Sequence, residues 1–342
     1  MYKIGILGYF AQGKIDYGGQ PVKTNNVYSG LLEKYGESEI KILDTGTLNN
    51  KILFLLRSVL IILHSKNLVI MPAHNGIIHF PKLYLTVKFL LKRRSKIHYV
   101  VIGGWLPKLL RQNAKLKRQL LKFDFIYVET NTMMKSLIKL GFHNVQVMRN
   151  VKKLDSNLET YTNNQEFIFC FYSRVIVEKG VEDAIEAIYE VNRNLDKKKC
   201  KLHIYGPISS DYELIIDKLI DNEIIQYKGI LDTNYAPIYL SKYFMQIFPT
   251  KFYTEGVPGS IIDSFYSGLP VLASRWESVC DVIQEGYNGI IYNFNDKKDL
   301  IEKILWTIDN KDEINEMRSR CIESSEQYNP NKALKVLTNN FI

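Results

Sequence analysis

The sequence predicts an α/β protein with two doubly wound domains that face a central cleft. The chain has 342 residues, more than a single hydrophobic core usually holds, and 46% of them are hydrophobic, as in globular proteins. Short apolar runs alternate with stretches of helical spacing, which is typical of parallel sheets with helices on both faces. We predict an N-terminal domain over residues 1–151, a polar linker over 152–165, a C-terminal domain over 166–325, and a helical segment over 326–342 that packs back on the N-terminal domain.

The N-terminal half opens with a predicted strand over Tyr2–Leu7, a loop with Gly18 and Gly19, and a helix near Asn25–Tyr35. No Gly-x-Gly-x-x-Gly pattern follows this strand, so the sequence does not predict a dinucleotide-binding fingerprint. The most apolar window, Ile52–Leu63, contains a charged residue and is too short to span a bilayer.

Two further strands of this half lead to polar side chains. Leu68–Met71 precedes His74, and Phe125–Val128 precedes Glu129. Ligands of α/β sheets bind at the carboxyl ends of strands. His74 is therefore either part of a site or a loop histidine with no role, and Glu129 either contacts a substrate or caps the next helix.

The C-terminal half begins with an apolar, aromatic strand over Phe167–Ser173, and a helix follows over Val181–Val191. The loop between them carries two cations, Arg174 and Lys179. Three more strands are predicted at Lys201–Tyr205, which ends at Gly206, at Ile224–Tyr227, which leads to Ile230, and at Phe244–Phe248.

The segment Glu255–Ser274 predicts a loop, a short helix, a turn and a strand. Its glycines permit close backbone approach, and Ser260 is a candidate N-cap. The first amides of a helix have no internal partner and attract an anion. The candidate ligand-binding residues here are Glu255, Gly256, Gly259, Ser260, Ile261 and Asp263. One helix end thus combines phosphate-binding amides with two carboxylates that can accept hydrogen bonds from hydroxyl groups.

This segment resembles the signature of the retaining, nucleotide-sugar-dependent glycosyltransferases of family 4. The family pattern has two glutamates separated by seven residues, with Gly-Phe-Pro after the first and Gly-Leu-Pro-Val downstream. Gly256–Pro258 and Gly268–Val271 match in register, whereas Asp263 replaces the second glutamate and is one methylene shorter. The family's Arg and Lys, five residues apart between a strand and a helix, are matched by Arg174 and Lys179.

The resemblance implies the GT-B architecture of two Rossmann-like domains and transfer of a hexosyl or N-acetylhexosaminyl group, with retention, from a UDP-linked sugar. It implies that Arg174 and Lys179 hold the diphosphate, where developing charge needs fixed cations. It also places Glu255 at the donor sugar and Asp263 at the ribose. The resemblance further implies a reaction that needs neither a metal ion nor a cofactor. Other residues that the resemblance brings near the donor are Gly18, Gly19, His74, Gly206 and Ile230.

Charge is divided unevenly along the chain. Residues 1–160 contain 25 Lys and Arg against 9 Asp and Glu, a net charge of +16, and residues 161–342 contain 20 against 27, a net charge of −7. Basic residues at helical spacing predict one stripe, formed by Lys108, Arg111, Lys115, Arg118 and Lys122. Three interpretations of this stripe are open: a helix face in contact with water, a surface that binds anionic lipid, or a surface that binds nucleic acid. No recognised nucleic-acid-binding module accompanies it, so we do not expect nucleic acid as a partner.

The remaining features concern metals and location. The sequence has no Asp-x-Asp, and its six histidines and four cysteines show no metal-ligand spacing. No signal-peptide pattern opens the chain, so we expect a cytoplasmic enzyme. The resemblance implies a peripheral enzyme on the anionic inner leaflet that extends a glycan or lipid-linked acceptor in bacterial capsule or other surface polysaccharide synthesis. The alternatives are a GT-B sugar-nucleotide epimerase and a non-catalytic basic protein that binds membrane or nucleic acid.

Overall fold

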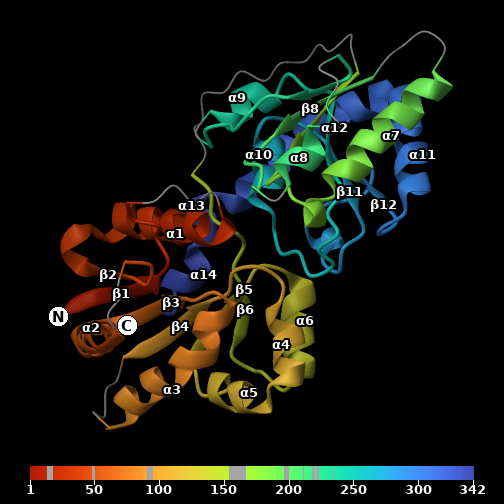
Figure 1. Ribbon diagram of the computed structural model, residues 1–342. Coiled ribbons are helices and arrows are strands. Elements are labelled where there is room, and N and C mark those ends of the chain that lie inside the picture. Colours follow the sequence, from red (N-terminus) through yellow and green to blue (C-terminus); the bar gives the residue numbers. More distant parts are fainter. Residues whose placement is uncertain are drawn as a thin grey trace. The chain divides into compact units, whose positions relative to one another are not determined.

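A computed structural model describes residues 1–13, 18–47, 51–90, 95–153, 167–195, 200–210, 212–217, 220, 223–233 and 235–342. The chain divides into two units (Figure 1). Unit 1 comprises Met1–Lys153 and Gln327–Ile342, and unit 2 comprises Leu154–Glu326. The predicted linker 152–165, apart from its first two residues, lies outside the described residues.

Unit 1 contains a parallel six-stranded sheet in the order β2-β1-β3-β4-β5-β6. Its strands are β1 (Tyr2–Gly8), β2 (Ile40–Asp44), β3 (Ser65–Met71), β4 (Lys96–Val100), β5 (Phe125–Val128) and β6 (Val145–Val147). The strand order reverses between β1 and β3. Successive residues of these strands face opposite sides, so Ile6 and Val69 enter one core while Leu7 and Ile70 enter the other.

Helices cover both faces of this sheet (Figure 1). One face carries α1 (Gly19–Tyr35), α13 (Pro330–Ala333) and α14 (Lys335–Thr338), so the C-terminal segment belongs to the core of unit 1. The other carries α2 (Lys51–His64), α3 (His74–Leu90), α4 (Leu106–Gln112), α5 (Ala114–Leu120) and α6 (Asn131–Lys139). A single turn of 3-10 helix, η1 (Glu37–Glu39), precedes β2.

Unit 2 repeats this plan with a parallel sheet in the order β12-β11-β10-β7-β8-β9. The strands are β7 (Ile168–Tyr172), β8 (Lys201–Tyr205), β9 (Ile225–Tyr227), β10 (Met245–Phe248), β11 (Val271–Ser274) and β12 (Gly289–Tyr292). The helices are α7 (Val181–Asn194), α8 (Glu213–Ile216), α9 (Ala236–Leu240), α10 (Gly259–Tyr266), α11 (Lys297–Asp309) and α12 (Lys311–Ser325), with short turns η2 (Val177–Lys179), η3 (Val279–Asp281) and η4 (Glu326–Tyr328). The predicted α/β class with two doubly wound sheets is confirmed.

Two predicted helix starts are displaced. The predicted loop at Gly18 and Gly19 is in fact the beginning of α1, with Gly18 as its N-cap. Pro21 is compatible with this start, because the N–H groups of the first turn have no partner within the helix. Likewise α10 begins at Gly259 with Pro258 as N-cap, so Ser260 lies inside the first turn and does not cap the helix.

The predicted single basic stripe is also corrected. Asn113 interrupts it between α4 and α5, because its backbone is non-helical and its side chain accepts a hydrogen bond from Leu116 N at 3.0 Å, which caps a new helix. Its basic residues thus lie on two short helices and the turn after them, and all of them are exposed: Lys108, Arg111, Lys115, Arg118 and Lys122.

Candidate functional site

The candidate site lies at the carboxyl edge of the unit 2 sheet, beside the neighbouring strands β7 and β10. The chain runs from β7 outward to β8 and β9, and then returns to place β10 on the other side of β7. In doubly wound sheets the loops after two such strands diverge and leave a crevice for a ligand. The loop after β7 carries Arg174 and Lys179, and the loop after β10 carries Glu255.

Close backbone packing sets the path of the first loop. Gly180 has φ of +73°, and a Cβ there would lie 2.0 Å from the carbonyl oxygen of Pro249. Lys251 N donates to Glu178 O at 2.8 Å, which ties the same two loops together. Only glycine fits at position 180, so the loop after β7 must turn at Lys179 and direct that side chain towards the loop after β10.

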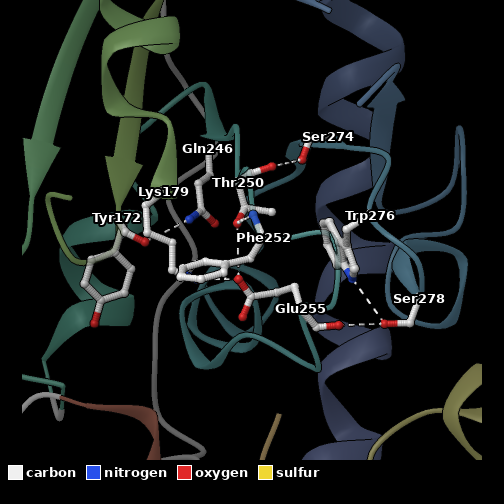
Figure 2. Close-up of polar contacts among 9 residues, drawn as sticks. All are labelled: Tyr172, Lys179, Gln246, Thr250, Phe252, Glu255, Ser274, Trp276 and Ser278. Atoms are coloured by element: carbon white, nitrogen blue, oxygen red, sulfur yellow. Dashed lines mark hydrogen bonds and ion pairs between the residues drawn. The ribbon is translucent and has the colours of Figure 1, made fainter. Parts of the chain in front are cut away.

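Lys179 and Glu255 form an ion pair between Nζ and Oε2 (Figure 2). The Lys179 side chain is only 9% exposed, and Glu255 is 18% exposed. The ammonium also lies 5.2 Å from the ring centroid of Phe252 and 5.3 Å from that of Phe248. The ammonium group of Lys179 is thus largely removed from water and is held by one carboxylate and two aromatic rings. The pair meets solvent mainly at Glu255.

The second loop is held by hydroxyl groups (Figure 2). Thr250 Oγ1 donates to Glu255 Oε2 at 3.2 Å, and Ser274 Oγ donates to Thr250 O at 2.7 Å. Ser278 Oγ donates to Glu255 O at 2.9 Å and accepts from Trp276 Nε1 at 3.2 Å. Both the backbone and the carboxylate of Glu255 are thereby fixed in place.

Arg174 differs from Lys179 in its surroundings. It is exposed, and its side chain has no hydrogen-bond or ion-pair partner among the residues that the structure describes. The loops 173–180 and 249–258 together contain three Lys and Arg against two Glu, a net charge of +1. The N-terminus of α10 adds the positive end of a helix dipole. One of its first amides, Ile261 N, already donates a hydrogen bond to Pro258 O at 3.2 Å. The edge of the sheet is therefore suited to an anion.

Asp263 lies in α10 and is 2% exposed. Its Oδ2 accepts a hydrogen bond from the hydroxyl of Tyr172 at 3.4 Å. Burial, and then the neighbouring Asp263 charge, raise the pKa of Tyr172, so this phenol stays protonated and acts as a donor. Asp263 faces Tyr172 in this arrangement, and its contact with a ribose stays a prediction.

The other predicted positions of unit 2 lie along the same carboxyl edge. Gly206 follows β8 with φ of +139°, and a Cβ there would lie 1.8 Å from Ser173 O, so the loop before Arg174 passes directly over it. Ile230 follows β9 and is 46% exposed. The loop residues Gly256 and Val257 are buried, whereas Gly259 at the helix start is exposed.

In unit 1 the structure assigns an unpredicted partner to Glu129. Lys23 of α1 donates to Glu129 Oε1 at 2.5 Å and to Val101 O at 2.9 Å, and each side chain of the pair is 3% exposed. Thr130, and not Glu129, caps α6 by accepting from Met133 N at 3.2 Å. The sequence carries no local signal for the pair, because 106 residues separate its members.

His74 lies at the first position of α3 and is exposed. Its ring centroid lies 5.2 Å from that of Trp105. Gln20, in the first turn of α1, donates to Met71 O at 3.3 Å. Gly18, Gly19 and His74 thus lie near the carboxyl edge of the unit 1 sheet, after β1 and β3. Among the described residues, no group of three or more His, Cys, Asp or Glu side chains could hold a metal ion.

The sequence profile of a family described as "Glycosyl transferases group 1" matches residues 157–328. The chain belongs to this family. The matched range corresponds closely to unit 2, which holds Arg174, Lys179 and Glu255.

Two curated relatives match about half of this chain. The alpha-monoglucosyldiacylglycerol synthase of Acholeplasma laidlawii is 23% identical over 177 residues, which cover 51% of this chain and 42% of that protein. An uncharacterized 41.2 kDa protein in the cps region of Klebsiella pneumoniae is 23% identical over 173 residues, which cover 49% of this chain and 45% of that protein. The matches thus span less than half the length of either relative.

Among solved structures, HepE from Anabaena in complex with UDP superposes on this chain with a TM-score of 0.75. It is 12% identical and 98% of each chain is covered. Sucrose-phosphate synthase from Thermosynechococcus elongatus also has a TM-score of 0.75 and 12% identity, with 99% of this chain and 98% of the other covered. Identity this low shows the fold alone, and the predicted GT-B architecture is confirmed.

Proposed function

We propose that unit 2 binds a UDP-linked sugar and that the enzyme transfers its hexosyl or N-acetylhexosaminyl group, with retention, to a glycan or lipid-linked acceptor. The observation that carries this proposal is the Lys179–Glu255 pair at the carboxyl edge between β7 and β10, with the exposed cation Arg174 in the same loop.

The chemistry follows from what each group offers. A nucleoside diphosphate brings negative charge to Arg174 and Lys179, and charge on the leaving group grows in the transition state, where fixed cations stabilise it most. When Lys179 turns to the diphosphate, Glu255 loses its ion pair and accepts hydrogen bonds from sugar hydroxyls. A phosphate oxygen takes the acceptor's proton on the face that the leaving group vacates, so retention needs no protein nucleophile.

The names of similar proteins support the substrate classes of this proposal. HepE was solved with UDP, the Acholeplasma laidlawii relative is a glucosyldiacylglycerol synthase, and the Klebsiella pneumoniae relative lies in a cps region. A bacterial lipid-linked or capsular acceptor, met at the cytoplasmic face of the plasma membrane, fits these three. None of the helices in the described parts of the chain combines the length and apolar character needed to cross a membrane.

A thermal-shift panel of nucleotides and nucleotide sugars tests the donor assignment. A ligand at 100 times its Kd stabilises the folded state by about 2.7 kcal/mol, so UDP and UDP-sugars should raise the melting temperature. Arg174→Ala and Lys179→Ala should abolish the rise, whereas Lys298→Ala, which changes an 88% exposed lysine of unit 2, should retain it. A rise that survives both site substitutions would place the nucleotide elsewhere.

An activity assay separates transfer from the alternatives. Product that forms only with acceptor indicates a glycosyltransferase, and an altered UDP-sugar without acceptor indicates an epimerase. Anomeric configuration read by NMR tests retention. We expect turnover to persist in excess EDTA, and loss that Mg²⁺ or Mn²⁺ restores would contradict the metal-independent mechanism.

A further inference from the structure

Helix α2 of unit 1 presents an apolar surface to solvent. The exposed fractions of its large hydrophobic residues are 72% for Ile52, 39% for Leu53, 46% for Leu55, 56% for Leu56 and 54% for Leu60. These five residues are called here the apolar face of α2. Polar residues normally occupy the outer side of a helix that packs on a sheet, so five large exposed hydrophobics on one helix mark a contact surface.

The opposite side of α2 is already used by the fold. Ile61 and Ile62 are buried in the core under the sheet, and the rings of Phe54 and Phe80 lie 5.1 Å apart between α2 and α3. The helix is therefore apolar almost all round. The apolar face lies away from this core, and the residues that the structure describes leave it exposed to solvent.

Helix α3, which packs against both α2 and α5, also carries exposed hydrophobic residues. Phe89 and Leu90 at its end are 82% and 68% exposed. Lys82 on the same helix is exposed, as is Arg57 on α2. Beyond α3, the exposed residues Lys115 and Arg118 lie on α5. The exposed residues named on these three helices are thus either apolar or cationic.

The charge of this region selects the partner. Between Asp44 and Asp124 the sequence has 15 Lys and Arg residues and no Asp or Glu. A second copy of the chain would bring the same positive charge against itself, and like charges oppose association. A surface that is both apolar and anionic meets both requirements, and an acidic lipid bilayer is such a surface.

We propose that the apolar face of α2 inserts into the interface of an anionic lipid bilayer, with the cations of α2, α3 and α5 against the headgroups. The helix has 14 residues, too few to span a bilayer, so it lies along the membrane plane. This contact places membrane binding on α2, and not on the basic residues of α4 and α5 alone. It does not depend on the transfer reaction, because binding is measurable without donor or acceptor.

Co-sedimentation with vesicles tests the proposal. The full chain should bind vesicles of phosphatidylcholine mixed with phosphatidylglycerol more strongly than vesicles of phosphatidylcholine alone. The double variant Leu56→Gln and Leu60→Gln should bind the acidic vesicles at least about tenfold more weakly, since two leucines no longer leave water. The matched control is Ile138→Gln, which changes a 48% exposed residue of α6 in the same unit and should bind like the wild type.

Two further measurements distinguish insertion from other contacts. Leu56→Trp should shift its fluorescence to shorter wavelength when acidic vesicles are added, because the indole enters an apolar medium. An unshifted emission, or equal binding of the double variant and the wild type, would overturn the proposal. Analytical ultracentrifugation without lipid should show a monomer, and a dimer that the double variant loses would assign the face to a second copy.

Discussion

Each unit has a lysine–glutamate pair at the carboxyl edge of its sheet, but the two pairs differ in exposure. In unit 1, Lys23 and Glu129 are each 3% exposed, and Val101 O accepts a further hydrogen bond from the lysine. In unit 2, Lys179 is 9% and Glu255 18% exposed, and the exposed Arg174 belongs to the same loop as Lys179. The pair of unit 1 is closed to solvent, whereas the glutamate of the unit 2 pair is partly exposed.

Because the two pairs differ in exposure, we expect the pair of unit 1 to be structural and the pair of unit 2 to contact a ligand. Lys23 joins α1 to the loops after β4 and β5, and Gly103 N also donates to Glu129 Oε1 at 3.5 Å. Such a pair stabilises or orients the chain and cannot reach a substrate without opening. The pair of unit 2 can exchange its partner for a ligand, because one side of the glutamate meets solvent.

The largest effect is expected when the closed pair loses one member. Lys23→Met or Glu129→Gln should lower the free energy of unfolding by about 3–5 kcal/mol, because the remaining charged or polar group stays buried. Replacement of both residues, Lys23 by Met and Glu129 by Leu, should restore most of the lost free energy of unfolding. Urea unfolding measures the change, and hydrogen exchange should locate it in unit 1. Removal of the exposed Lys153–Glu33 pair is the control and should cost less than about 1 kcal/mol. Comparable losses for the two pairs would contradict the distinction.

The open pair should instead control turnover. Arg174→Ala and Lys179→Ala should each lower kcat by at least about a hundredfold, which is typical when a charge partner of the transition state is removed. Circular dichroism should show an unchanged fold, and Lys298→Ala should keep the wild-type rate. Near wild-type turnover in both site variants would exclude this edge of the sheet as the donor site.

The two acids of unit 2 should differ from each other. Glu255→Gln should reduce kcat/KM more than Asp263→Asn does, because Glu255 is open to solvent, whereas Asp263 is 2% exposed and accepts from Tyr172. Steady-state kinetics of the two variants measures the ratio. A stronger effect at Asp263 would mean that the shorter acid has a task other than the expected ribose contact.

The last effect depends on pH and concerns one histidine in each unit, His98, which is buried, and His203, which is half-buried. Burial lowers the pKa of His98 to about 3 and that of His203 to about 4. The unfolded chain then takes up the proton first, so this contribution to stability is complete above pH 6.5 and is lost as pH falls, at up to about 1.4 kcal/mol per pH unit. His98→Gln should flatten the decline of unfolding free energy between pH 6 and 4, and a slope equal to the wild type would disprove the assignment.

Much of the architecture was predictable because it depends on local patterns. The apolar runs before Arg174 and Glu255 became β7 and β10, and the alternation of strands and helices produced two parallel sheets. Side-chain periodicity did not predict the break at Asn113, since Asn caps a helix only when its backbone leaves the helical region, and that depends on how α4 and α5 pack. Periodicity also cannot tell which apolar residues of α2 stay in solvent.

By itself the sequence determined the fold class and the family, and it predicted the cations and acids of the candidate site, because motif spacing and hydrophobic period are properties of nearby residues. Only the tertiary structure decided which charges meet. Lys179 reaches Glu255 across 76 residues, and Lys23 reaches Glu129 across 106, because parallel strands bring their carboxyl ends to one edge. Burial, which separates the closed pair from the open one, depends on every element around it and is not encoded at any single position.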